Sequence, residues 1–491
     1  MTRHYLRWPP VLIALLCLIH GTVRAEPNLP DLGDESAALI SPSEERRMGE
    51  DFMRQARAQL NLISDPQINE YLQTIGHRVS RDAVPPPGIQ FFVVNNPTIN
   101  AFAIPGGFIG VHTGLLLATR NDAELAAVLA HETAHLSQRH IPRMIADSQR
   151  ASLPTMAAIL AGILLAASTK GAGGEATVAM ATAGMAQHQI NFTRGFEEEA
   201  DRIGMKFLNA AGYDARAMPA FFERMDSLNR VSEADVPEFL RDHPVTTRRI
   251  AESRNHAEQF PRRAEGDNTD FLTMQARLRV LVGNADDAVR YFRGNLDQGA
   301  RTSPSDHYGL ALALLGSNQV DAARRECDAL LRQTPGSLAY QLLRADIEAA
   351  AGHTGDALNY YAATVRQFPQ SRAAVQKYAD ALIKSKHYDD AAKLLDRAVR
   401  STPDEPELYR LLATAAGEAG HPMEAHRAFG EYYYLLGQPR AAIDQLELAI
   451  RHANNSFYYV SSLEARIREI REQAGLPGKD SQPSKPRKGD N

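Results

Sequence analysis

The chain has 491 residues, of which 44% are hydrophobic and 23% are charged, and its formal net charge is −5. This length exceeds what one domain usually needs, so we expect several folded units. The small negative charge, with no basic run in the folded part, argues against a nucleic-acid partner.

The first 25 residues have the pattern of a cleavable export signal. Arg3 and Arg7 give a positive start, residues 11–19 are apolar, and small or apolar residues precede the expected cleavage after Ala25. A retained membrane anchor is the alternative. That apolar run is much shorter than the roughly 20 residues that span a bilayer, so we favour cleavage.

Cleavage would remove Cys17 and leave Cys327 as the only cysteine. The mature chain would then have no internal disulfide and no metal site built of thiolates. Any metal must therefore be held by His and carboxylate side chains.

Helical and extended segments alternate in the region that follows. Three prolines at residues 85–87 end the first helical pattern, because proline cannot continue a helix. Pro105-Gly106-Gly107 is a turn signature, and Asn121 with Asp122 caps the next helix. The expected elements are a helix over about 43–80, a strand over 89–94, two short strands within 101–111 and a helix over 121–140.

His131-Glu132-Thr133-Ala134-His135 is the strongest motif of the chain. Four residues of a helix advance about 400°, so the two imidazoles lie about 40° apart and can share a metal. Glu132 is displaced by about 100°, where it can take a proton from metal-bound water. The preceding residues 126–130 are apolar, as a buried helix requires. The alternative is a pair of exposed histidines with no role.

Further ligands come from a second helix that begins after Gly195. Glu197 and Asp201 lie one turn apart on one face of it. A catalytic zinc site needs three protein ligands and an open fourth position, and Glu197 can complete the set. Asp201 can accept a hydrogen bond from the outer nitrogen of a ligating histidine. Glu198 and Glu199 are explained equally well as an acidic helix N-terminus.

Residues 151–186 form an apolar insert, rich in Ala, Gly, Leu and Met. Pro154 interrupts it, and its Ala and Gly content keeps it only mildly hydrophobic. Three alternatives stay open for this insert: a transmembrane helix, a peripheral contact with a membrane or a substrate, and a helical hairpin packed on its own domain.

From about Asp270 the sequence is helical and repetitive. Pro335, Pro369 and Pro403 are 34 residues apart, which is the period of tetratricopeptide repeats. Such repeats stack into a superhelix with a concave surface. Each repeat should turn between its two helices through a left-handed residue. The expected turn residues are Gly283, Asn318, Gly352, Lys386, Gly420 and Gly437.

Three further motifs accompany that of residues 131–135: Arg139-His140, Thr193-Arg194 and Glu197-x-x-Ala200-Asp201. Together they resemble the HtpX/CAAX-prenyl-protease-like zinc peptidases, although Thr193 stands where that family more often has Ser. The export signal, Asn100-Ala101-Phe102-Ala103, the repeats and His243-Pro244-x-x-x-x-Arg249 resemble its BepA-like periplasmic branch.

The resemblance implies a Gram-negative periplasmic zinc metalloendopeptidase with chaperone-like activity in quality control of outer-membrane β-barrel assembly. It implies one Zn²⁺ per chain, with Glu197 as the third ligand and Asp201 as the second acid. It also suggests that His243 reaches the open zinc position and makes the enzyme latent. Arg249 could then stabilise the oxyanion, with an ordinary loop and a surface arginine as the alternative. Helical projection puts His140 on the opposite side of the helix from His131, so we expect a structural role for it.

The expected fold is mainly α: a zincin-type α+β metallopeptidase domain with a small sheet, followed by an all-α superhelix of tetratricopeptide repeats. The domains expected are an export signal (1–25), a peptidase domain (26–265), repeats (266–472) and a disordered tail (473–491).

Peptide hydrolysis is the reaction expected, with Glu132 passing a proton from water to the leaving amine. The strands within 101–111 would offer their edge to an extended substrate. Unfolded or misfolded polypeptides are the expected substrates, and the repeats would bind the β-barrel assembly machinery or its clients. The rivals are a non-proteolytic repeat-protein chaperone with a closed zinc site and a membrane peptidase anchored by residues 151–169.

Overall fold

The computed structural model describes residues 40–83, 88–147, 160–162, 164, 183–231, 237–297, 303–454 and 456–476. The export signal, most of the apolar insert and the tail beyond residue 476 lie outside these residues. Among the helices that are described, each is too short or too polar to cross a membrane.

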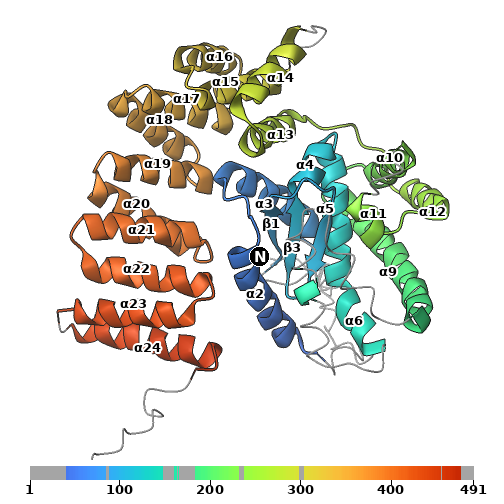
Figure 1. Cartoon of the computed structure of the whole chain (residues 1–491), viewed down its shortest axis with the longest axis horizontal. Coiled ribbons are helices and arrows are strands. Elements are labelled where there is room, and N and C mark those ends of the chain that lie inside the picture. Colours follow the sequence, from blue (N-terminus) through green and yellow to red (C-terminus); the bar gives the residue numbers. More distant parts are fainter. Residues whose placement is uncertain are drawn as a thin grey trace, which may run out of the picture.

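The N-terminal part is an α+β domain built on a three-stranded sheet (Figure 1). Its strands are β1 (Gln90–Val94), β2 (Ala101–Ile104) and β3 (Phe108–His112). They lie in the order β1-β3-β2, with β1 parallel and β2 antiparallel to β3. These strands confirm the sequence prediction, and β2 lies at an edge of the sheet.

Helices pack against both faces of the sheet. Successive residues of a strand point to opposite sides, so β1 contributes side chains to two cores. Phe91 and Val93 of β1 belong to a core shared with α3 (Pro66–Ser80) and α5 (Asp122–Ser137). Phe92 and Val94 belong to a second core that they share with α2 (Pro42–Gln59).

The single helix expected over 43–80 is wrong, because the chain forms α2 and α3 with a break between them. Leu62, within the break, forms a bridge with Val94 at the end of β1. Asp65 caps α3 by accepting hydrogen bonds from the backbone of Gln67 and Ile68. Pro66 occupies the first turn, where its missing N–H costs nothing. The signal for the break was the Asp-Pro pair.

The helix expected over 121–140 ends earlier, at Ser137. Arg139 adopts a left-handed conformation with φ of 52°, and a new helix, α6 (His140–Asp147), begins directly after it. Other helices in the described part of this domain are α4 (Thr113–Ala118), α9 (Ala183–Ala210), α10 (Ala217–Val231), α11 (Glu238–Asp242) and α12 (Thr247–Ala257).

The C-terminal part is a curved array of antiparallel helix pairs (Figure 1), as the 34-residue period predicted. Its helices are α13 (Thr269–Val282), α14 (Ala285–Asp297), α15 (Pro304–Gly316), α16 (Val320–Gln333), α17 (Leu338–Ala350), α18 (Thr354–Gln367), α19 (Arg372–Lys384), α20 (Tyr388–Ser401), α21 (Pro406–Glu418), α22 (Pro422–Leu435), α23 (Pro439–Arg451) and α24 (Phe457–Gln473).

Left-handed residues stand at most of the predicted turns between paired helices. The residues with positive φ at these turns are Asn318, Gly352, Lys386, Gly420 and Gly437. The prediction is wrong for Gly283, whose φ is −104°. There α13 ends in an extended residue, and Asn284 accepts hydrogen bonds from the first turn of α14.

Helix α3 of the N-terminal domain packs against the array, and Figure 1 shows it beside α19. The Glu70 carboxylate accepts hydrogen bonds from the Ser371 hydroxyl (2.9 Å) and the Ala373 N–H (2.8 Å) at the start of α19. At the N-cap of α3, five residues before Glu70, Asp65 forms a bidentate ion pair with Arg277 of α13, with N–O distances of 2.6 and 2.8 Å. Both partners of this pair are buried, with side chains 9% and 8% exposed.

We expect Asp65→Ala to destabilise the protein by about 3–5 kcal/mol, because it leaves the Arg277 guanidinium buried without its counter-charge. Urea unfolding followed by circular dichroism measures this. Asp287→Ala is the matched control, since it removes an ion pair with Arg290 whose side chains are 66% and 72% exposed. An Asp65→Ala protein as stable as the control would contradict the prediction.

Candidate metal centre

The motif of residues 131–135 lies in the buried helix α5. The Asn121 side chain caps this helix by accepting a hydrogen bond from the Glu124 backbone (2.9 Å). The helix packs against the sheet and α3 through Leu125 to Ala130, all of them buried. His131 and Glu132 are each only 1% exposed. The expectation of a buried helix is therefore confirmed.

Helix α9 approaches α5 closely at Gly204. A Cβ atom at this position would lie 3.1 Å from both the Ala130 carbonyl oxygen and the His131 backbone nitrogen. A larger residue would push the two helices apart. Glu197 and Asp201 precede Gly204 by two turns and one turn on the same helix. The close contact therefore brings both carboxylates to the histidines of α5.

Four side chains converge on one point: His131, His135, Glu197 and His243, whose ligand atoms lie within 4.8 Å of one another. The His131 Nε2 is 3.1 Å from the His135 Nε2 and 3.3 Å from the His243 Nδ1. The His135 Nε2 is 3.3 Å from a Glu197 oxygen. A tetrahedral ion with bonds of about 2.0–2.1 Å needs ligand atoms about 3.3 Å apart. These residues therefore fit a metal ion without rearrangement.

Neighbouring side chains keep Glu197 ionised although it is buried. Burial alone would raise its pKa, but His243, Arg249 and His135 lower the pKa well below its usual value. The Arg249 guanidinium lies 2.9 Å from a Glu197 oxygen. An ionised carboxylate is the form that binds a cation.

Asp201 and Arg249 form a buried pair behind the histidines. Two guanidinium nitrogens of Arg249 donate to the Asp201 carboxylate, at 2.7 and 2.8 Å. An Asp201 oxygen lies 3.0 Å from the His131 Nδ1, on the side of the ring away from the four-residue cluster. The guanidinium also lies over the Phe222 ring, 4.6 Å from its centroid. Arg249 thus faces carboxylates of its own chain.

His243 contacts both the cluster and the glutamate of the motif. Its Nδ1 lies 3.0 Å from a Glu197 oxygen, and its Nε2 lies 3.3 Å from the Glu132 Oε1. Among the described residues, no group forms a hydrogen bond with this buried Glu132 oxygen. Burial raises the pKa of Glu132, which makes its carboxylate a stronger base.

The segment that holds His243 is tied to the residues that lead into β2. The Phe239 N–H donates to the Ile99 carbonyl (2.9 Å), and the Asn100 amide donates to the Asp242 carboxylate (2.8 Å). The Phe239 ring is fully buried, with its centroid 4.9 Å from that of His243. Neither tie was expected, since a hydrogen bond between residues 142 apart leaves no local sequence signal.

His140 lies beside His135, which corrects the expectation from helical projection. That projection assumed a continuous helix, whereas the chain turns at Arg139. As a result the His140 Nδ1 lies 2.9 Å from the His135 Nδ1. His140 is nevertheless outside the four-residue cluster, and its other ring nitrogen faces Glu199 at 3.3 Å.

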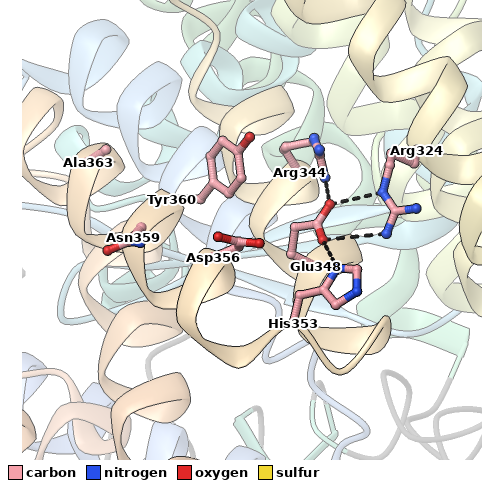
Figure 2. A pocket seen from close by; sticks show the side chains of 8 residues that line it. All are labelled: Arg324, Arg344, Glu348, His353, Asp356, Asn359, Tyr360 and Ala363. Carbon is pink, nitrogen blue, oxygen red and sulfur yellow. Dashed lines mark hydrogen bonds and ion pairs between the residues drawn. The ribbon is translucent and has the colours of Figure 1, made fainter.

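A second group that could hold a metal lies in the array: Glu348, His353 and Asp356 (Figure 2). The Glu348 carboxylate there already accepts hydrogen bonds from Arg324, Arg344 and His353. His353 and Asp356 are exposed. Because the only buried ligand is neutralised by two guanidinium groups, this group is a much weaker candidate than the one around His131.

All of the site residues predicted from the sequence lie together at the first cluster. Comparison with known proteins identifies the family of each part of the chain. Residues 66–257 match peptidase family M48, and residues 273–338 and 348–415 match tetratricopeptide repeats. The resemblance inferred from the motifs is therefore confirmed.

Full-length relatives share both parts. The chain is 31% identical to the beta-barrel assembly-enhancing protease of Escherichia coli K12 over 453 residues, which cover 91% of each chain. It is 32% identical to the Yersinia pestis protein of that name over 456 residues, 92% of this chain and 93% of the relative. A mitochondrial metalloendopeptidase OMA1 from Schizosaccharomyces pombe is 29% identical over 218 residues, 43% of this chain and 60% of that one. The chain thus belongs to the family of the beta-barrel assembly-enhancing proteases, which are M48 metallopeptidases with tetratricopeptide repeats.

Proposed function

We propose that this metallopeptidase uses one zinc ion and acts in the periplasm on unfolded or misfolded polypeptides, as part of quality control in outer-membrane β-barrel assembly. The export-signal pattern supports the periplasmic location, and the names of the relatives support the role in β-barrel assembly. A donor set of imidazoles and a carboxylate, without thiolate, supports zinc of the catalytic kind.

The position of Glu132 is the observation that carries the proposal. Its Oε1 is buried beside the metal ligands, forms no hydrogen bond in the described chain and faces the His243 Nε2 at 3.3 Å, which suits a general base once His243 leaves the site. A purely structural metal site has no use for such a group. The rival, a non-proteolytic chaperone with a closed site, draws its support from His243 as a fourth ligand.

In this proposal His131, His135 and Glu197 are the permanent ligands, and His243 is a displaceable fourth. Bound zinc would polarise the scissile carbonyl and acidify the attacking water. Glu132 accepts the proton from that water and delivers it to the leaving amine. The edge of β2 would hold the polypeptide through main-chain hydrogen bonds, which favours unfolded clients of any sequence.

Asp201 and Arg249 have positioning roles in this scheme. Asp201 lies 3.0 Å from the His131 Nδ1, where it would accept the outer proton of His131 and so fix the tautomer that ligates through Nε2. Arg249 holds the carboxylates of Asp201 and Glu197 in place. This arrangement favours a positioning role for Arg249 over the oxyanion contact expected from the sequence.

The repeats would supply the contact with the β-barrel assembly machinery or its clients, and a chaperone-like activity would reside in that contact. A stacked array offers an extended surface for protein binding. The apolar insert would add a peripheral membrane contact.

Glu132→Gln is the first test of the proposal. We expect cleavage of an unfolded model protein to fall by at least about 10²-fold, because the amide cannot accept the proton, while zinc stays bound. Activity and zinc content are measured on the same samples. Unchanged cleavage would reject Glu132 as the base, and absence of cleavage by every form, including His243→Ala, would favour the chaperone rival.

His243→Ala tests latency. We expect cleavage to become several-fold faster, by about tenfold where the closed form outweighs the open one by ten to one. Zinc content should stay the same, since three ligands remain. A loss of both zinc and activity would instead make His243 a permanent ligand. A Glu197→Gln protein, expected to lose zinc, provides the comparison.

Asn100→Ala tests whether the tie to Asp242 holds His243 in the site. Losing one partly buried hydrogen bond shifts such an equilibrium by up to about 1 kcal/mol, or about fivefold, so cleavage should become faster. The same change made in a His243→Ala background should have no effect, because nothing remains to be released. Equal effects in both backgrounds would show that Asn100 acts elsewhere.

A further inference from the structure

His140 lies where it can orient a metal ligand without being one. Its Nδ1 is 2.9 Å from the Nδ1 of His135, the nitrogen that faces away from the four-residue cluster. Its Nε2 is 3.3 Å from a Glu199 oxygen. His140 is 3% exposed, so water does not compete freely for these contacts.

One arrangement of protons satisfies all of these contacts. A metal ligand must have a bare nitrogen, so the His135 that ligates through Nε2 carries its proton on Nδ1. That N–H can donate only to a bare Nδ1 of His140. The His140 proton then sits on Nε2, from which it donates to Glu199. The chain of two hydrogen bonds fixes the tautomers of both rings.

Two neighbours, Phe196 and Glu199, hold the His140 ring in place, and Arg143 supports both of them. The Phe196 ring stacks on it, with a centroid distance of 4.4 Å and an interplanar angle of 17°. Arg143 fixes the Glu199 carboxylate through an ion pair of 3.0 Å and lies over the Phe196 ring, 4.9 Å from its centroid. The His140 ring is therefore already oriented before it contacts His135.

We propose that His140, held by Glu199, is a positioning residue that keeps the His135 imidazole in its ligating tautomer and orientation. The two ligands of α5 are then supported differently, His131 by the Asp201 carboxylate and His135 by a neutral imidazole. The acidic run that holds Glu197 thus contributes Glu199 as well. This inference rests on the ligand set proposed above.

The test is a chelator competition on the purified full-length protein, which gives the zinc affinity without an activity assay. His140→Leu should weaken zinc binding by about 10–100-fold. Glu199→Gln should weaken it by less, because an amide still accepts the hydrogen bond. Glu198→Gln is the matched control, since Glu198 is the neighbouring acid and pairs with the surface residue Arg248. Its affinity should equal that of the wild type.

His140→Gln separates positioning from packing. A glutamine can accept from His135 and donate to Glu199, so it should restore most of the affinity lost in His140→Leu. Equal affinities in His140→Leu and wild type would overturn the inference, as would equal losses in His140→Leu and His140→Gln with both proteins folded by circular dichroism. If His140→Leu does not fold, Glu199→Gln is the deciding variant. A zinc affinity of Glu199→Gln equal to that of the wild type would reject the positioning role of His140. A wild type that binds no zinc would instead reject the proposed function.

Discussion

The metal centre depends on the close contact of α5 and α9 at Gly204. His131 and His135 come from one helix and Glu197 and Asp201 from another, so the site exists only where the two axes approach closely. A Cβ atom at Gly204 would lie 3.1 Å from the Ala130 carbonyl oxygen, the His131 backbone nitrogen and the Met218 Cε. Two of these atoms belong to the backbone of a buried helix, which moves less readily than a flexible side chain, so the absence of a Cβ atom at Gly204 helps to set the metal geometry.

Charge balance is the second constraint at the site. Three buried carboxylates, those of Glu132, Glu197 and Asp201, would repel one another without compensation. Arg249 compensates two of them directly, and the cation that the site is built to hold would compensate the rest. His243 takes part in the same balance, because its ring lies between Glu132 and Glu197. If His243 left the site, the charges of Glu132 and Glu197 would therefore become accessible together with an open coordination position.

Sequence reasoning succeeded where the signal is local. The motif of residues 131–135 and the 34-residue period each depend on a repeating helical geometry, and both are present as expected. It failed where the conformation of a single residue changes the course of the chain. The left-handed conformation of Arg139 ends α5 and brings His140 next to His135. Gly283 ends α13 without the positive φ that was expected there. The tie between Asn100 and Asp242 depends on tertiary packing, which no spacing encodes.

The shortness of β2 has a consequence for how clients are selected. A strand of four residues presents only a few outward main-chain groups, and each net hydrogen bond contributes about 1 kcal/mol. An isolated peptide would therefore have low affinity and leave quickly. A client that is also bound by the array is different, because its effective concentration at the strand is raised by the tether. Under the proposed function, selectivity would then come from avidity, because the site would cut polypeptides that the repeats already bind.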